Sequence, residues 1–229
     1  MNRVAVVVAT LLLVVVGANA QGAQSSNTDV YHVHFVKAAL GQAKALENDL
    51  KKQDPKAPMP GHYLVLRHQD GDDWDYVVIE HLGKKYTIDP AEFTPPPAGT
   101  PALSAWHTDT FVSGPSWEVF AKEMGLGDEG KTGSVYVVAT WRPAPGHRQD
   151  LGKALTAQDA NSKVPTGHVI LMHMEGGPWV FLALDRFNSW QDYATGEAAT
   201  QDSQGWYDVR NYGVWHHDTI TTRVATAGK

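Results

Sequence analysis

Cysteine is missing from all 229 residues of this sequence, and its absence excludes several kinds of chemistry. Disulfide bonds, thiol catalysis, iron–sulfur clusters and cysteine-based zinc sites all need this residue. The fold must therefore be stabilised by packing and hydrogen bonds alone. The glycine-rich loops of nucleotide-binding proteins and the serine motif of hydrolases are also missing. No nucleotide cofactor is expected.

Long hydrophobic runs are missing after the N-terminal segment. No later run approaches the ~20 apolar residues of a membrane-spanning helix. Residues 1–20 differ. Arg3 precedes an apolar run from Val4 to Val16, and Ala18-Asn19-Ala20 has the small residues of a signal peptidase site. The sequence therefore predicts a signal peptide over residues 1–20 and an exported protein, periplasmic or secreted, without membrane insertion.

Positive charge is also in short supply, with 19 Lys and Arg against 25 Asp and Glu. The formal net charge is −6, and removal of Arg3 with the signal peptide makes it −7. This balance disfavours nucleic acid and anionic membranes as partners. Aromatic residues with polar atoms are plentiful, with eight Trp and eight Tyr against six Phe. Such residues fill the cores of small sheets or line a ligand pocket.

The chain contains an internal repeat. Four segments of the first half have similar segments in the second half, in the same order. The pairs are 30–35 with 135–140, 61–67 with 167–173, 74–80 with 179–185, and 106–111 with 215–220. Four matches in register indicate a duplication. Each segment is short, rich in β-branched and aromatic residues and bounded by Gly, Pro or Asp, which predicts strands.

Helical spacing of apolar residues predicts a helix over residues 37–52 and its counterpart after Pro145 to about Ala160. Ser189 opens a plausible capping box, which predicts a third helix to about Thr200. A short helix is expected over Ser116 to Met124. Each half then has the order β-α-β-β-(α)-β, which is a ferredoxin-like repeat.

The predicted fold class is α+β, with two tandem ferredoxin-like repeats. A sheet with helices on one side leaves its other face open, so the two copies can cover each other and form a barrel within one chain. The expected organisation is a signal peptide (1–20), a flexible segment (21–29), a first repeat (30–125), a linker (126–133), a second repeat (134–226) and a tail (227–229).

This pattern resembles the dimeric α+β barrel superfamily in tandem form, over residues 30 to 226. The stretch Asp185-Arg-Phe-Asn-Ser-Trp-Gln-Asp-Tyr193 is similar to the corresponding segment of antibiotic-biosynthesis-monooxygenase-like, EthD-like and NIPSNAP-like members. The resemblance implies the fold, and relatives readily form homo-oligomers. It implies little about activity, because the superfamily spans several reactions. Haem-binding relatives use a helical histidine that only His147 approaches, so haem is not expected.

The first strand carries two histidines. Side chains alternate along a strand, which puts His32 and His34 on one face. Tyr31, Val33 and Phe35 lie on the other face, which we expect to pack against helices. His32 and His34 would then point between the two sheets, as catalytic acid–base groups or as ligands of one metal ion. Alternatively, they face solvent or form local hydrogen bonds.

The second half has Val137 and Ala139 at the positions of the two histidines. An imidazole wall facing an apolar wall would suit a single pocket for a small-molecule ligand, with Tyr31, Trp106 and Trp215 shaping it. Arg67 is a candidate for orienting an anionic substrate together with Glu80. The alternative is a surface ion pair between them.

His107 and Asp109 share a strand face, and His216 and Asp218 repeat this spacing. Because this His–Asp pair is present in both halves, the simplest interpretation is a structural pair joined by a hydrogen bond. The alternative is a transition-metal site in which His107 and Asp109 are completed by His32 or His34. No compact metal-ligand motif such as HExxH is present.

Three functional hypotheses follow. The first is an exported enzyme, monooxygenase- or isomerase-like, that acts without an organic cofactor on an apolar or aromatic substrate in the pocket between the sheets. The second is a non-enzymatic envelope protein that binds a small ligand or a transition metal through its strand histidines. The third is a structural scaffold whose barrel is a filled core.

Overall fold

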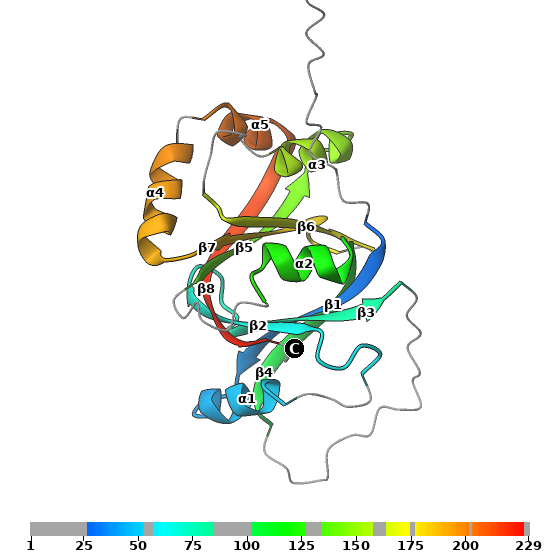
Figure 1. The fold of residues 1–229 in the computed structure, drawn as a ribbon, viewed down its shortest axis with the longest axis vertical. Helices are drawn as coiled ribbons and strands as arrows, with labels where there is room; N and C mark the ends of the chain where they lie inside the picture. The colour runs from blue at the N-terminus through cyan, green and yellow to red at the C-terminus, as the bar shows by residue number, and fades with distance from the viewer. Residues whose placement is uncertain are drawn as a thin grey trace, which may run out of the picture.

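Eight antiparallel strands form one closed barrel in the computed structural model (Figure 1). The structure describes residues 27–52, 57–84, 102–126, 134–157, 164–174, 177–201 and 203–226. The predicted signal peptide, most of the linker and the tail lie outside them. The strands are β1 (Asp29–Ala38), β2 (Tyr63–Asp70), β3 (Tyr76–Gly83), β4 (Ser104–Gly114), β5 (Val135–Pro143), β6 (Gly167–His173), β7 (Phe181–Phe187) and β8 (Gly213–Thr226).

The barrel order is β1-β3-β2-β8-β5-β7-β6-β4, so each half contributes four neighbouring strands in the same internal order. The halves join through the β2–β8 and β4–β6 pairs. The predicted α+β barrel is therefore confirmed. Three strands separate β1 from β5 in each direction around the ring, which places these equivalent strands on opposite sides of the barrel.

Large apolar side chains fill the barrel. On β1 the inward residues are Tyr31, Val33 and Phe35, and on β5 they are Tyr136 and Val138. The expectation that this face of β1 packs against helices is wrong. In a closed barrel, one face of every strand in both halves points into the interior. Side chains must fill this interior at the density of a protein core.

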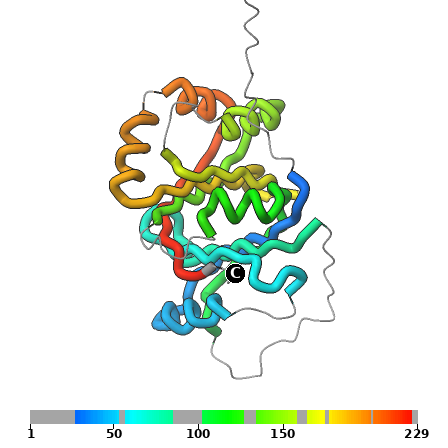
Figure 2. The backbone as a smooth tube through the Cα atoms, viewed as in Figure 1, coloured from blue at the N-terminus to red at the C-terminus, as the bar shows by residue number. Residues whose placement is uncertain are grey.

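Helices cover the two halves unequally. They are α1 (Ala43–Leu50), α2 (Trp117–Glu123), α3 (Arg148–Thr156), α4 (Trp190–Thr200) and α5 (Gln204–Tyr212). In Figure 2, α3, α4 and α5 gather beside the strands of the second half, while α1 lies alone at the bottom. Within the described ranges, no helix has the length and apolar character needed to cross a bilayer.

The helix predicted over residues 37–52 begins only at Ala43. Strand β1 continues to Ala38, and Gly41 then turns the chain with a φ of 75°, a conformation that glycine adopts without strain. The predicted N-cap of α4 is confirmed, because the Ser189 hydroxyl accepts a hydrogen bond from the amide of Asp192 at 3.1 Å. Helix α5 was not predicted.

Helix α2 closes one end of the barrel, in the centre of the view in Figure 1. Phe120 and Met124 are fully buried in the barrel core, and the Phe120 ring lies 5.1 Å from that of Tyr31. The Tyr136 hydroxyl donates a hydrogen bond to the Met124 carbonyl at 3.0 Å. The sequence predicted this helix but not its position.

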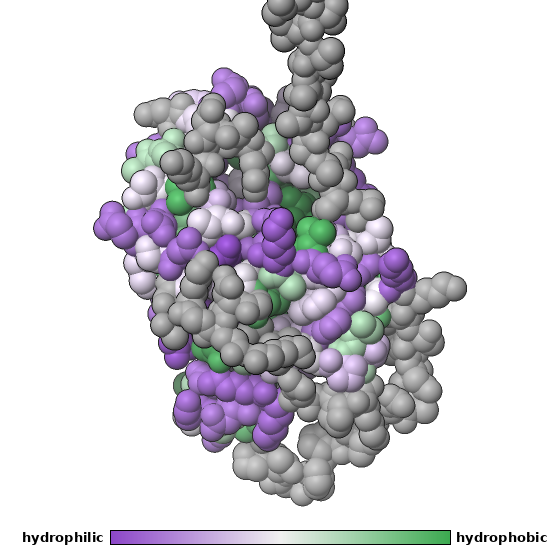
Figure 3. All heavy atoms as spheres, viewed as in Figure 1, coloured by the Kyte–Doolittle hydropathy of each residue, from purple (hydrophilic) through white to green (hydrophobic). Residues whose placement is uncertain are grey.

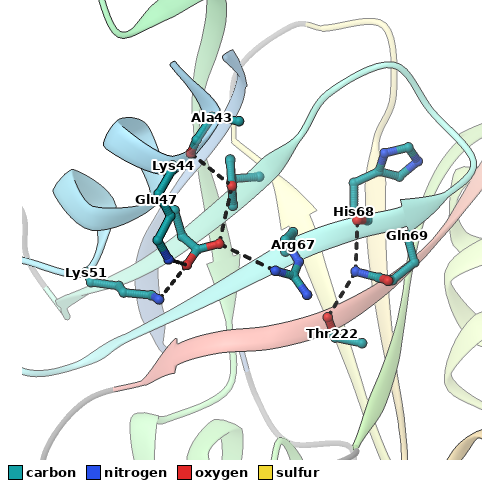
Figure 4. Close-up of polar contacts among 9 residues, drawn as sticks. Ala43, Lys44, Glu47, Lys51, Arg67, His68, Gln69 and Thr222 are labelled. Atoms are coloured by element: carbon teal, nitrogen blue, oxygen red, sulfur yellow. Dashed lines mark hydrogen bonds and ion pairs between the residues drawn. The ribbon is translucent and has the colours of Figure 1, made fainter. Parts of the chain in front are cut away.

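Arg67 belongs to a cluster that fastens α1 to the barrel (Figure 4). The Glu47 carboxylate is 8% exposed and lies 2.6 Å from the Lys51 amine and 3.5 Å from the Arg67 guanidinium. Arg67 therefore pairs with Glu47 rather than with Glu80. Helix α1 is strongly charged and forms the hydrophilic patch at the lower left of Figure 3.

The Glu47 cluster predicts a pH-dependent contribution to stability. The hydrogen bond from Lys51 lowers the pKa of Glu47 from its ordinary value of 4.5 to about 2; burial opposes this, and Lys44 adds to it. The stabilisation is therefore complete above about pH 5 and is lost as the pH falls toward about 2. We expect Glu47→Gln to lower the free energy of unfolding by about 1 kcal/mol at neutral pH, because half-exposed lysines are screened. Denaturant titrations should show this difference falling below half by about pH 3. A difference independent of pH would contradict this assignment.

Candidate functional sites

Five side chains form an imidazole–carboxylate cluster on the outer face of the first half. They are His32, His34, Glu80, His107 and Asp109. Nε2 of His32 and Nδ1 of His34 lie 2.9 and 2.7 Å from the same oxygen, Oδ1 of Asp109. Nδ1 of His107 lies 2.7 Å from Oδ2 of that carboxylate. Nδ1 of His32 lies 2.9 Å from Oε2 of Glu80.

Strand pairing brings these side chains together. His34 lies opposite Asp109 in the β1–β4 pair, and His32 lies opposite Glu80 in the β1–β3 pair. His32 and His34 are two residues apart and therefore share one face of β1. The ring of Phe111 lies 5.4 Å from that of His32. The cluster is thus held by the three neighbouring strands β4, β1 and β3 rather than by loops.

The charges of the cluster support one another. Burial lowers the pKa of His32, but hydrogen bonds to Asp109 and Glu80 outweigh it and raise the pKa to about 9. Hydrogen bonds from His32 and His34 hold the pKa of the Asp109 carboxyl well below its ordinary value. At neutral pH a protonated His32 therefore lies between the Asp109 and Glu80 carboxyl groups.

The predicted place of His32 and His34 is wrong, although the predicted alternation is right. They lie on the outer face with 22% of each side chain exposed, and not in the space between the sheets. That space is filled by the barrel core. The structure does bring His107 and Asp109 beside them, as expected for a transition-metal site. The hydrogen bonds to Asp109 and Glu80 also match the alternative that the two histidines form local hydrogen bonds.

The aromatic residues expected to shape an inter-sheet pocket belong to the core. Tyr31 is fully buried, its hydroxyl donates to the Pro115 carbonyl at 2.7 Å, and burial raises its pKa far above the ordinary value. Trp106 and Trp215 are half-buried and pack against the barrel core. None of the three lies in the imidazole–carboxylate cluster.

A cavity of about 530 Å³ lies outside the barrel, between the second half and α3, α4 and α5. We call it the α3–α5 pocket. Its floor is the outer face of β5 and β7, and its wall includes the flat ring of Trp206. Apolar residues dominate, with a few polar groups among them, as in ligand pockets generally. The floor residues are Val137, Ala139, Trp141, Ala183, Asp185 and Phe187.

His168 lines this pocket with both of its ring nitrogens in hydrogen bonds. Its Nδ1 lies 2.6 Å from Asp185 Oδ1, and its Nε2 lies 2.7 Å from the Leu155 carbonyl. The carbonyl can only accept, so Nε2 donates to it. Burial lowers the pKa of His168, but the charge and hydrogen bond of Asp185 and the bond to Leu155 outweigh it and raise the pKa. An imidazole with both nitrogens engaged in this way is poorly placed to accept a proton from a ligand.

Two further carboxylates line the pocket and remain able to take up a proton. Burial raises the pKa of Asp218; the charges of His216 and Arg210 oppose this, and Asp185 adds to it. Burial raises the pKa of Glu197, and the charges of Asp218 and Asp185 raise it further. About half of the Asp218 side chain remains open to solvent, so a ligand can reach it.

The sequence analysis missed the α3–α5 pocket. The available signal was the pair Val137 and Ala139, which are apolar on the face opposite Tyr136 and Val138. A strand that is apolar on both faces packs against a core on each side. This pattern indicates a helix layer over β5, and the same reasoning would have turned His32 and His34 outward.

The comparisons support the fold. No protein-family model matches this sequence, and no curated protein is similar to it at the level of sequence. Among solved structures, the chain is similar to an anthrone oxidase-like protein, with a TM-score of 0.54, 14% identity, and coverage of 90% of this chain and 96% of that one. It is also similar to a putative monooxygenase from Lactobacillus acidophilus NCFM, with a TM-score of 0.52, 10% identity and coverage of 88% and 97%. At these identities the likeness establishes a shared mixed α+β barrel fold.

Proposed function

We propose that this chain is an enzyme that binds a small, flat, mainly apolar molecule in the α3–α5 pocket and removes a proton from it. The observation that carries this proposal is the presence of Asp218 and Glu197, each with a raised pKa, in a cavity whose floor is apolar apart from Asp185. A carboxylate whose pKa is raised toward neutrality is a more effective general base. Asp218 is the better candidate because a strand fixes its backbone.

The pocket suits an aromatic substrate. Trp141 lies in its floor, and its ring stacks on His216 with 4.3 Å between centroids. Trp206 lies in its wall and is backed by the Arg210 guanidinium 3.8 Å from the ring centroid. Two fixed indole rings favour a planar ligand. The raised pKa of His168 favours its protonated form, which would stabilise negative charge on a deprotonated substrate.

The solved structure described as anthrone oxidase-like suggests a probe. Anthrone is planar and apolar, and its methylene group is acidified by two rings and a carbonyl. Loss of one methylene proton to Asp218 gives an enolate without any organic cofactor. Reaction with dioxygen then converts one anthrone and one dioxygen into one anthraquinone and one water. Proton abstraction is shared with isomerisation, the other reaction class considered.

Exchange of the anthrone methylene hydrogens with deuterated solvent tests the proton abstraction directly. The protein should accelerate exchange, and Asp218→Asn should reduce the acceleration at least about 100-fold, which is the usual contribution of a general base. Asp150→Asn is the matched control, because this carboxylate lies on α3 and pairs with His147 outside the pocket. Mass spectrometry measures exchange, and absorbance measures anthraquinone.

Two outcomes would oppose the proposal. If anthrone does not bind, and the protein does not accelerate exchange of its methylene hydrogens, this class of substrate is excluded. Acceleration that survives both Asp218→Asn and Glu197→Gln shows that the pocket carboxylates are not the base. Quenching of tryptophan fluorescence by anthrone reports binding separately, since Trp206 and Trp141 line the cavity.

The proposal extends to export and ancestry. Residues 1–20 would direct the chain out of the cytoplasm, and the mature protein would begin at Gln21. N-terminal sequencing of protein recovered outside the cytoplasm tests this cleavage; an intact Met1 there would contradict it. The equal strand order of the two halves supports descent from one duplicated unit.

A further inference from the structure

We propose that His32, His34 and Asp109 bind one divalent first-row transition-metal ion on the outer face of the first half. The site lies on the side of the barrel opposite the α3–α5 pocket, because β1 and β5 are separated by three strands in each direction. It is therefore independent of the proton abstraction proposed for that pocket.

The spacing of the donor atoms fits one ion. One donor atom from each of His32, His34 and Asp109 lies within 4.8 Å of the other two. Ligand atoms held ~2.0–2.1 Å from one metal stand roughly 3.0–3.4 Å apart. His32 Nε2 and His34 Nδ1 now lie 2.9 and 2.7 Å from Asp109 Oδ1. Opening these contacts by about half an ångström makes room for metal–ligand bonds.

The ligands are oriented by neighbours. Metal-binding histidines commonly donate their second nitrogen to a carboxylate, which fixes the ring and its tautomer. Here Nδ1 of His32 lies 2.9 Å from Glu80 Oε2, so the metal would bind Nε2 and displace its proton. His107 holds the other oxygen of Asp109, at 2.7 Å. Each of these partners lies on a strand of the sheet, so the donor set is assembled before any ion binds.

The types of ligand atom limit which metal ions can bind. Two imidazoles and one carboxylate suit Zn²⁺, Fe²⁺, Co²⁺ or Ni²⁺, whereas Ca²⁺ and Mg²⁺ prefer oxygen ligands alone. Three protein ligands leave coordination positions for water or a small molecule. The Asp109 side chain is 40% exposed, so these positions face solvent. This openness is typical of a reactive or exchangeable site rather than of a closed structural one.

The second half provides an internal comparison. Ala139 lies opposite Asp218 in the β5–β8 pair, just as His34 lies opposite Asp109 in the β1–β4 pair. Val137 stands at the position of His32. The carboxylate is thus present in both halves, but the imidazoles that would complete a metal site are present only in the first. If the barrel itself required histidines at the positions of His32 and His34, both halves would carry them.

Zinc and cobalt titrations of the untagged mature chain test the site. Isothermal titration calorimetry should show one high-affinity zinc ion per chain. Cobalt should give visible d–d absorption bands, which report nitrogen and oxygen ligands independently of any activity. We expect His34→Ala to weaken zinc binding at least about 100-fold, and Glu80→Ala to weaken it about 10–100-fold, as for other carboxylates that orient a metal-bound histidine.

Matched variants separate this site from adventitious binding to surface histidines. His147→Ala removes an exposed histidine that pairs with Asp150 through a 3.0 Å contact, and it should leave zinc affinity unchanged. Thermal melts in metal-free buffer establish that each variant is folded. If His34→Ala does not fold, His34→Gln replaces it. The proposal is overturned if the chain binds no zinc, or if zinc binds equally well after the His34 substitution.

Discussion

Replacing Arg186 by alanine is expected to lower the free energy of unfolding by about 3–5 kcal/mol. Arg186 is buried on β7, and its guanidinium donates to three oxygens from separate segments. These are the Glu123 carbonyl at 2.8 Å, Asn188 Oδ1 at 2.9 Å and the Thr166 carbonyl at 3.2 Å. The three contacts are partly buried, and a fully buried acceptor left without a donor costs about 1–3 kcal/mol.

The position of Arg186 explains why the loss should be large. Glu123 is the last residue of α2, so the guanidinium fastens the helix that closes the barrel to the strand beside it. A positive charge near the C-terminal carbonyls of a helix is also favourable. Chemical denaturation measures the effect. Arg186→Lys keeps the charge but cannot reach all three acceptors, so its loss should be intermediate.

Arg148→Ala is the control for this prediction. Arg148 is exposed at the start of α3, and its loss should change stability by no more than about 0.5 kcal/mol. If Arg186→Ala is tolerated as well as Arg148→Ala, the three hydrogen bonds do not fasten α2.

Phe120→Ala is expected to cost about 3–5 kcal/mol, in the range of other large-to-small core substitutions. The Phe120 ring is fully buried and lies 5.1 Å from the ring of Tyr31 and 5.5 Å from that of Trp117. Its removal leaves a hole at the barrel end, because the surrounding strands are fixed by their own hydrogen bonds and cannot collapse into it.

Val119→Ala on the same helix is the matched control. Val119 is exposed, so this change should alter stability by less than about 0.5 kcal/mol. Thermal and chemical unfolding of both variants compares the two faces of α2. Equal losses would mean that α2 rests on the surface rather than closing the barrel.

Much of the fold could be predicted from the sequence because the strands are short, apolar and repeated. The match between residues 30–35 and 135–140 predicted two equivalent strands, and the open faces of the two sheets predicted a barrel. The order of the strands around the closed ring was not predicted. Helix lengths were predicted less well. The chain around Gly41 contains apolar residues at helical spacing, yet pairing with β3 and β4 extends β1 to Ala38.

The candidate sites could be predicted only in part. Alternation along β1 separated His32 and His34 from Tyr31 correctly. The alternation could not identify which face points inward, because it separates the two faces of a strand without showing which of them is buried. The contact of His107 and Asp109 with the two histidines depends on register between strands far apart in the sequence. The α3–α5 pocket depends on α5, a nine-residue helix of polar sequence that was not predicted.

The opposite placement of β1 and β5 has a consequence for how this protein can evolve. When a barrel is assembled from two copies of one subunit, every mutation changes both outer walls at once. In this chain each wall is encoded by its own codons, so selection can act on one while the other is preserved. Histidines at 32 and 34 can therefore coexist with valine and alanine at 137 and 139. Joining the halves in one polypeptide frees each wall to acquire its own chemistry.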